Sequence, residues 1–254
     1  MKKVLCILLA AFAAQLITAQ EKTLKDNRFD FSVDLKTSHL WRGLIISDKP
    51  MAAVFMKLKL NTSGSFSTGF WGGMAFSNES DGTSYKEINY YLQYAKSGFS
   101  IGLWNLFNTR GVESPDIWNY TKETTGHILD LRTSYNFGES FPLTLEANVF
   151  LYGSVDVQYT NSNFEQRHST YVQVSYPLIT ASKVDVSGFL GAGFSLNGDT
   201  HLYGDGTKNF DLVNVGFNAS KTVKFGDYNL PISVNTLWNP SVKYARVQLI
   251  VHLF

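Results

Sequence analysis

Apolar and polar residues alternate with a period of two through most of this chain, and this pattern constrains the fold more than any other feature. It begins at Phe29, where Phe31, Val33 and Leu35 alternate with polar neighbours. A period of two places the apolar residues on one face of a β-strand, whereas a helix needs a period near 3.6. Ten segments follow the pattern up to residue 253, and none shows a convincing helical period. Residues 66–76 and 99–107 are rich in glycine and aromatic residues on both faces, and we count them as two further strands, which gives about twelve. We therefore predict an all-β fold.

The lengths of the connections distinguish two kinds of all-β fold. Short links lie around residues 62–64, 96–97, 138–140, 180–182 and 226–227, and long polar links span residues 43–50, 77–84, 109–125, 153–166 and 197–209. Short turns at one end and long loops at the other are typical of transmembrane barrels. We predict a transmembrane antiparallel up-and-down β-barrel of about twelve strands in the bacterial outer membrane. A secreted soluble β-sandwich is the alternative, because it also has one apolar and one polar face per strand.

The first residues are typical of an export signal. Lys2 and Lys3 precede the apolar run 4–17, and the small residue Ala19 stands before Gln20. The run is shorter than the ~20 residues that a membrane-spanning helix needs. We expect a cleavable signal peptide over residues 1–19, cut between Ala19 and Gln20, and the barrel over residues 20–254. Cys6 is the only cysteine, so the mature chain would have no disulfide and no thiolate metal site.

Aromatic residues near the ends of the predicted strands suggest two interfacial girdles. The girdle candidates are Trp41, Phe66, Tyr94, Phe99, Phe137, Tyr176, Phe225, Tyr228 and Trp238. Aromatic rings concentrate at both interfaces of transmembrane barrels. In a soluble sandwich the same rings would belong to the core.

Charged residues on the polar face give the candidates for a pore lining. They are Asp34, Lys36, Lys57, Lys59, Glu87, Asp130, Arg132, Glu146, Asp185 and Arg246. A Lys or Arg on the lipid face costs ~2–4 kcal/mol near the membrane midplane, so the alternation must direct these charges inward. About eight strands fill with side chains and about sixteen leave a channel, so twelve allow either a narrow pore or a plugged lumen. The mixed signs predict weak ion selectivity.

No catalytic or cofactor-binding motif stands out. The five histidines are far apart in sequence, and the chain has neither a G-x-S-x-G elbow nor a P-loop. We expect no enzyme activity, no cofactor and no metal site. The net charge of +1 gives no electrostatic footprint for nucleic acid.

Several short motifs between Asp30 and Trp104 resemble one family. They are Phe31-Ser32-Val33-Asp34-Leu35, the strand end Leu40-Trp41-Arg42-Gly43, Ser47-Asp48 with Pro50, Gly69-Phe70-Trp71-Gly72-Gly73, Glu87-Ile88-Asn89-Tyr90-Tyr91 and Ser97-Gly98-Phe99-Ser100. This stretch resembles the TorF-type porins of Gram-negative outer membranes, and the aromatic-Arg-Gly strand end is its most specific element. The resemblance implies an outer-membrane barrel that passes small solutes. Residues 109–125 form a longer loop than in that family.

These observations lead to one functional hypothesis and one alternative. We expect a porin-like channel for passive diffusion of small polar solutes or ions. The alternative is a non-conducting structural or surface-binding barrel that acts through its long extracellular loops, above all residues 109–125 with Trp118. A membrane enzyme acting on lipids is disfavoured, because the sequence shows no paired nucleophile and base. The expected partners are outer-membrane lipid, the barrel-assembly machinery and a small polar solute.

Overall fold

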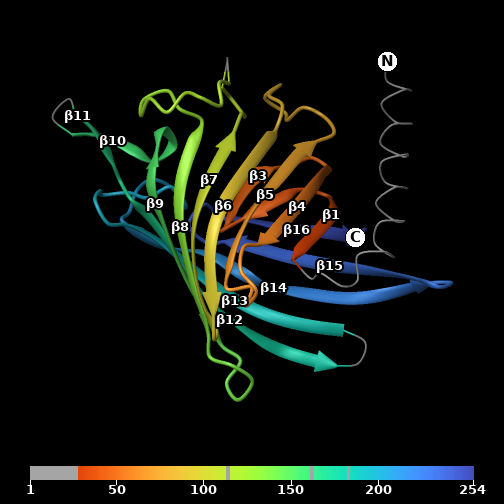
Figure 1. Ribbon diagram of the computed structural model, residues 1–254. Helices are drawn as coiled ribbons and strands as arrows, with labels where there is room; N and C mark the ends of the chain where they lie inside the picture. Colours follow the sequence, from red (N-terminus) through yellow and green to blue (C-terminus); the bar gives the residue numbers. More distant parts are fainter. Residues whose placement is uncertain (1–27, 113–114, 161–162, 182–183) are drawn as a thin grey trace, which may run out of the picture.

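A computed structural model describes residues 28–112, 115–160, 163–181 and 184–254. The predicted signal peptide, with Ala19 and Gln20, lies outside the described residues. Among the described residues, twelve strands form a closed antiparallel barrel (Figure 1). In chain order they are β1 (Phe29–Lys36), β4 (Met51–Lys59), β5 (Phe66–Ala75), β6 (Lys86–Lys96), β7 (Phe99–Asn108), β8 (His127–Asn136), β9 (Thr144–Gly153), β12 (Ser169–Ala181), β13 (Val184–Ser195), β14 (Phe210–Phe225), β15 (Tyr228–Asn239) and β16 (Tyr244–His252). The predicted strand number and topology are confirmed.

The connections differ between the two ends of the barrel. Ser97 and Gly98, at φ 51° and 83°, join β6 to β7 through a two-residue turn in which both central residues have positive φ. At the opposite end, long segments follow β5 and β7; Figure 1 shows them at the top, and the short connection after β8 at the bottom. Both ends of the described barrel wall, β1 and β16, are neighbours in the sheet.

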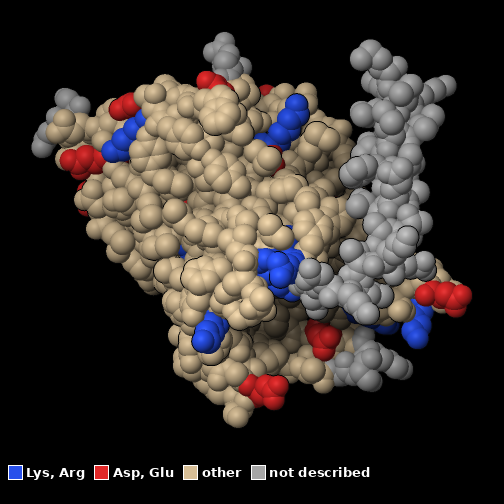
Figure 2. Space-filling view, in the orientation of Figure 1, with Lys and Arg blue, Asp and Glu red and all other residues tan. Residues whose placement is uncertain are grey.

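Apolar side chains cover the outside of the barrel. Leu92, Leu190 and Val247 are 55%, 46% and 65% exposed. They lie on β6, β13 and β16, which are well separated around the barrel. In the view of Figure 2, charged residues gather toward the ends of the barrel and leave a broad uncharged band between them. Closure pairs the backbone groups within the sheet, as a bilayer requires. The protein is therefore a transmembrane barrel of the bacterial outer-membrane type, and the soluble sandwich is wrong because its apolar faces would be buried.

The first predicted strand is shorter than the alternation suggests. The pattern runs from Phe29 to Arg42, but β1 ends at Lys36 and a small hairpin follows, formed by β2 (His39–Trp41) and β3 (Leu44–Ser47). Its turn consists of Arg42 and Gly43, whose φ values of 49° and 83° fit the two-residue turn that tight hairpins favour. Alternation continues through this segment because the hairpin is itself made of strands.

A second small hairpin lies in the connection 153–166, which we expected to be a loop. It consists of β10 (Val157–Thr160) and β11 (Asn163–Gln166) and follows the 3-10 turn η1 (Ser154–Asp156). Across the described ranges, no helix is long and apolar enough to cross a membrane.

Candidate pore and the hairpin inside it

The β2–β3 hairpin enters the lumen and is fastened to the far wall by its tip. Arg42 donates from Nη1 and Nη2 to the two carboxylate oxygens of Asp130 on β8, at 3.1 and 2.8 Å. Its Nη1 also lies 3.3 Å from the hydroxyl of Tyr203, which belongs to the loop after β13. Asp130 is fully buried. A two-pronged guanidinium–carboxylate pair of this kind fixes geometry as well as adding energy.

Glycine is required at the tip of the hairpin. The carbonyl of Gly43 accepts hydrogen bonds from Asn239 Nδ2 at 3.0 Å and from Tyr244 Oη at 2.7 Å. A Cβ on Gly43 would lie 2.2 Å from the carbonyl oxygen of Val213 on β14. The positive φ and this close approach both disfavour a side chain. Gly43 therefore allows the tip of the hairpin to pack closely against β14, β15 and β16.

The same hairpin covers a gap in the wall. β1 pairs with β16 only through Asp34, Leu35 and Lys36, so the upper part of β16 has no strand partner on that side. Contacts with the hairpin segment replace the missing pairing: Gln248 Nε2 donates to the carbonyl of Ser38, and Arg246 forms an ion pair with Asp48 at 3.5 Å. The residues on either side of the hairpin therefore border upper β16 on the side where β1 is absent.

Trp41 lies inside the barrel and not at the membrane interface. Its ring stacks on Phe150 of β9, with centroids 5.9 Å apart, and beneath the guanidinium of Arg42 at 4.4 Å. It packs against a buried cluster formed by Leu106, Ile128, Phe150, Tyr171, Tyr203 and Val213. The girdle prediction for Trp41 is thus wrong, because the chain turns inward after Lys36 and carries this ring with it.

Two cavities lie in the lumen beside the hairpin. The upper cavity, about 440 Å³, opens among the long loops and is mostly apolar, with Leu44, Ile46, Trp71, Leu106, Ile128 and Leu202 in its lining. The lower cavity, about 420 Å³, is mostly polar, with Gln93, Ser134, Glu146, Asn148, Gln173 and Asn218 in its lining. Trp41, Trp104 and Arg132 line both cavities. These three side chains form the partition between them.

The partition is held by stacking and by charge. Tyr91 stacks on the Trp104 ring with centroids 4.1 Å apart, and the Arg132 guanidinium carbon lies 4.1 Å from the same ring centroid. Two groups at this distance must cover opposite faces of the indole. Arg132 Nε also donates to Asp130 at 2.6 Å, so that carboxylate is shared between Arg42 and Arg132.

Loops at the mouth of the upper cavity are tied together by Arg110. Its Nη1 donates to the carbonyl of Ile46 at 2.8 Å, its Nη2 pairs with Asp81 at 3.1 Å, and its Nε lies 3.3 Å from Thr83 Oγ1. Hydrogen bonds from Thr83, assisted by Arg110, lower the pKa of Asp81 to about 2. Because the carboxylate stays charged well below neutral pH, these loops remain linked in mildly acidic surroundings.

The predicted pore-lining charges lie at different levels of the barrel. Asp130 and Arg132 lie at the partition, Glu146 lines the lower cavity and Glu87 lines the upper one. The others are paired or peripheral: Asp34 with Lys36 at 3.6 Å, Lys59 with Asp30 at 3.6 Å, Arg246 with Asp48, Lys57 half-buried on β4, and Asp185 exposed at the start of β13. That any of them lines a conducting path stays a prediction.

The remaining girdle candidates lie on the outer surface. Phe66, Phe99, Phe137, Tyr176, Phe225, Tyr228 and Trp238 are each at least 40% exposed, and Tyr94 packs on Phe66 with ring centroids 4.9 Å apart. Trp238 is near the long loops and the others are near the short turns, as the sequence suggested. Their contact with lipid headgroups stays a prediction.

Sequence reasoning placed Asp130 on the inward face but did not predict its pairing with Arg42. Arg42 entered as part of the strand-end motif Leu40-Trp41-Arg42-Gly43, and Trp104 and Tyr203 carried no role of their own. The turn chemistry of Arg42-Gly43 was the one available signal, because a glycine after a polar residue is common in two-residue hairpin turns.

A hydrogen-bonded Ser–His–Asp chain also arises only in the folded protein. Ser233 Oγ lies 2.9 Å from His252 Nε2, and His252 Nδ1 lies 2.7 Å from Asp34 Oδ1. The three residues come from adjacent strands β15, β16 and β1, and they link the strands where the barrel closes. We interpret the chain as a connection across this seam.

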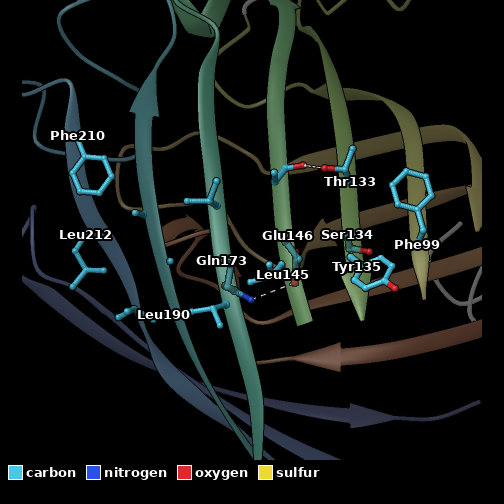
Figure 3. Close-up of a pocket in the computed structure, with 15 residues that line it drawn as sticks. Phe99, Thr133, Ser134, Tyr135, Leu145, Glu146, Gln173, Leu190, Phe210 and Leu212 are labelled. Atoms are coloured by element: carbon cyan, nitrogen blue, oxygen red, sulfur yellow. Dashed lines mark hydrogen bonds between the residues drawn. The ribbon is translucent and has the colours of Figure 1, made fainter. Parts of the chain in front are cut away.

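An apolar hollow lies on the outside of the wall. It measures about 590 Å³ and is lined by Leu145, Ala147, Val172, Leu190, Ala192 and Leu212, among others. Figure 3 shows these strands from nearby; the labelled Glu146 and Gln173, joined by a hydrogen bond of 3.4 Å, belong to their polar inner face. Small side chains on the outer face produce the hollow, which acyl chains would fill.

Comparisons with known proteins do not identify a family. No protein-family model and no curated protein sequence matches the chain. Solved structures that match include the KdgM porin (10% identity, TM-score 0.43, 87% of this chain and 97% of that chain) and the NanC porin (9%, 0.45, 88% and 98%). Another is the translocator domain of the autotransporter NalP from Neisseria meningitidis (13%, 0.40, 96% and 94%). The resemblance to TorF-type porins stays a prediction.

Proposed function

We propose that the protein is an outer-membrane channel for passive diffusion of small solutes, with a path that runs past the internal hairpin. One observation carries the proposal. The lumen contains an upper and a lower cavity, and the same three side chains, Trp41, Trp104 and Arg132, line both. A movement of these side chains would join the two cavities, whereas a fully plugged barrel would have packed side chains at every level.

The surroundings of the partition suggest how such a channel would select. The hairpin narrows a lumen that twelve strands would otherwise leave wider, so only small solutes would pass. Charges of both signs lie near the path, namely Arg42, Asp130, Arg132 and Glu87. Mixed charges support weak selectivity among simple ions.

Conductance of the refolded protein in planar bilayers tests the proposal. We expect wild type to conduct, and Trp104→Ala to conduct more, because it removes a ring from the partition. Trp238→Ala is the matched control, since Trp238 lies on the outer face and is 51% exposed. Silent bilayers with wild type and Trp104→Ala, both shown to be folded by heat-modifiable gel migration, would rule out the channel.

The alternative function is a non-conducting, surface-binding barrel. The buried cluster around Phe150 and Tyr203 favours it, because this cluster fills part of the upper lumen. The loop after β7 could then provide the binding surface: Trp118 is 84% exposed, and Tyr120 folds back over the outer wall, where it stacks on His127 with ring centroids 4.1 Å apart. A silent barrel whose Trp118→Ala variant loses a surface phenotype would support this second function.

A further inference from the structure

The upper cavity combines an apolar lining with one arginine whose terminal nitrogens are unused. Three charged residues contribute to its lining: Glu87, Arg110 and Arg132. Arg110 uses Nε and both terminal nitrogens on Thr83, Ile46 and Asp81. In Arg132, by contrast, Nε contacts Asp130, and the terminal nitrogens Nη1 and Nη2 have no hydrogen-bond partner among the described residues.

Arg132 is already oriented for a ligand. Its guanidinium is stacked on the Trp104 ring and tied at Nε to Asp130, so its plane is fixed on one face and one edge. Its side chain is 25% exposed, and it lines both cavities. A guanidinium with two free parallel donors matches a carboxylate, and a fixed orientation reduces the entropy lost on binding.

The charges immediately around Arg132 also favour an anion, and Glu87 is the charge that offsets them across the cavity. Arg42 and Arg132 share the single carboxylate of Asp130, which leaves one net positive charge among the three residues. Glu87 is the opposing charge in the cavity. Its carboxylate accepts hydrogen bonds from Tyr85, Asn89 and Asn108, at 3.1, 2.7 and 3.0 Å, so the protein's own donors already engage it.

We infer that the upper cavity binds small amphipathic carboxylates, with the carboxylate on Arg132 Nη1 and Nη2 and an apolar or aromatic body against Leu44, Leu106 and Leu202. A cavity of about 440 Å³ lies within the size range of small-molecule sites. The inference deepens the proposed function, because it names the solute class of the same path and assumes that solutes reach the cavity from outside.

Calorimetry on the refolded full-length barrel in nanodiscs tests the inference with three probes. These are 3-phenylpropanoate, its neutral amide 3-phenylpropanamide, and acetate. We expect the acid to bind roughly tenfold or more tightly than the amide, because only the acid forms charge-assisted hydrogen bonds. We expect acetate to bind more weakly than the acid, because it lacks the apolar body.

Variants assign the effect to Arg132. Arg132→Gln should bind acid and amide alike, and Arg132→Lys should recover only part of the difference, since lysine lacks the two-donor fork. Lys224→Gln, which removes one positive charge from the exposed short-turn end of β14, should behave as wild type. Glu87→Gln should bind the acid at least as well as wild type. Heat-modifiable migration establishes that each variant is folded.

The outcomes separate this inference from the channel proposal. Equal affinity of wild type for acid and amide, or an unchanged preference in folded Arg132→Gln, would overturn the carboxylate site even if the barrel conducts. A silent barrel that still prefers the acid through Arg132 would sustain the site and remove only the channel.

Discussion

At the scale of single residues, the interior of this barrel depends on contacts that tolerate little change. Gly43 combines a φ of 83° with a backbone neighbour that a Cβ would approach to 2.2 Å. Asp130 is fully buried and receives three guanidinium contacts from Arg42 and Arg132. Each of these residues fixes the position of the hairpin, and neither contributes to the apolar outer surface.

Gly43→Ala should unseat the hairpin and raise conductance, because the added methyl group collides with the Val213 carbonyl. Gly82→Ala is the matched control: Gly82 has a φ of 81°, but nothing lies within 4 Å of its added Cβ. Both variants incur the ~1–2 kcal/mol cost of a left-handed alanine, and only Gly43→Ala adds the collision. Equal single-channel conductance of the two variants would contradict the proposal that close packing of Gly43 on Val213 holds the hairpin in place.

At the scale of elements, the β2–β3 hairpin has two structural roles. It covers the wall above the short β1–β16 seam, and it narrows the lumen between β8 and β14. The seam itself is reinforced by the Ser233–His252–Asp34 chain. Because the same segment borders the wall and narrows the lumen, the proposed channel function predicts that stability and conductance change together.

Asp130→Asn should loosen the hairpin and increase conductance, because Arg42 and Arg132 would lose their shared counter-charge. Breaking a buried ion pair costs about 3–5 kcal/mol, so the denaturant midpoint in liposomes should fall. Asp156→Asn is the control. Asp156 is also fully buried, but it binds Ser169 and Arg167 in the loop region.

Both substitutions should therefore lower stability, whereas only Asp130→Asn should change conductance. If Asp156→Asn raised conductance to the same extent, general loosening of the barrel would explain the effect, and the hairpin tether would not.

At the scale of the whole molecule, the barrel reverses the arrangement of a soluble protein. Its outer face carries exposed apolar residues such as Leu190, and its lumen carries a polar network that includes Gln173, Glu146 and Asn214. Closure pairs every wall strand with two neighbours, although β1 and β16 pair only over a short stretch, and a bilayer supplies the medium that covers the apolar face.

Leu190→Arg should lower the stability of the barrel in bilayers by ~2–4 kcal/mol, because it places a charge against lipid. Asn218→Arg, on the lumen side and in the lining of the lower cavity, should cost much less. Equilibrium refolding into phosphatidylcholine vesicles measures both. A larger penalty for Asn218→Arg would reverse the assigned faces.

The sequence by itself determined the strands, their number and the face of each strand that meets lipid. These properties follow from local alternation, because residues two positions apart in a strand lie on the same face. The short turns and long loops also fixed the orientation of successive strands. The alternating segment from Phe29 to Arg42 shows the limit of local information, since alternation is the same in the wall strand β1 and in the hairpin inside the lumen.

Only the tertiary structure decided what occupies the lumen. Arg42 and Asp130 are 88 positions apart in the sequence. Gly43 contacts Val213, Asn239 and Tyr244, which lie still farther along the chain. Periodicity within a segment does not predict these long-range contacts. They depend on barrel closure, which brings β8, β14 and β16 around the hairpin. A polar residue on an inward face can therefore be recognised from sequence, whereas its partner across the lumen is set by the three-dimensional path of the wall.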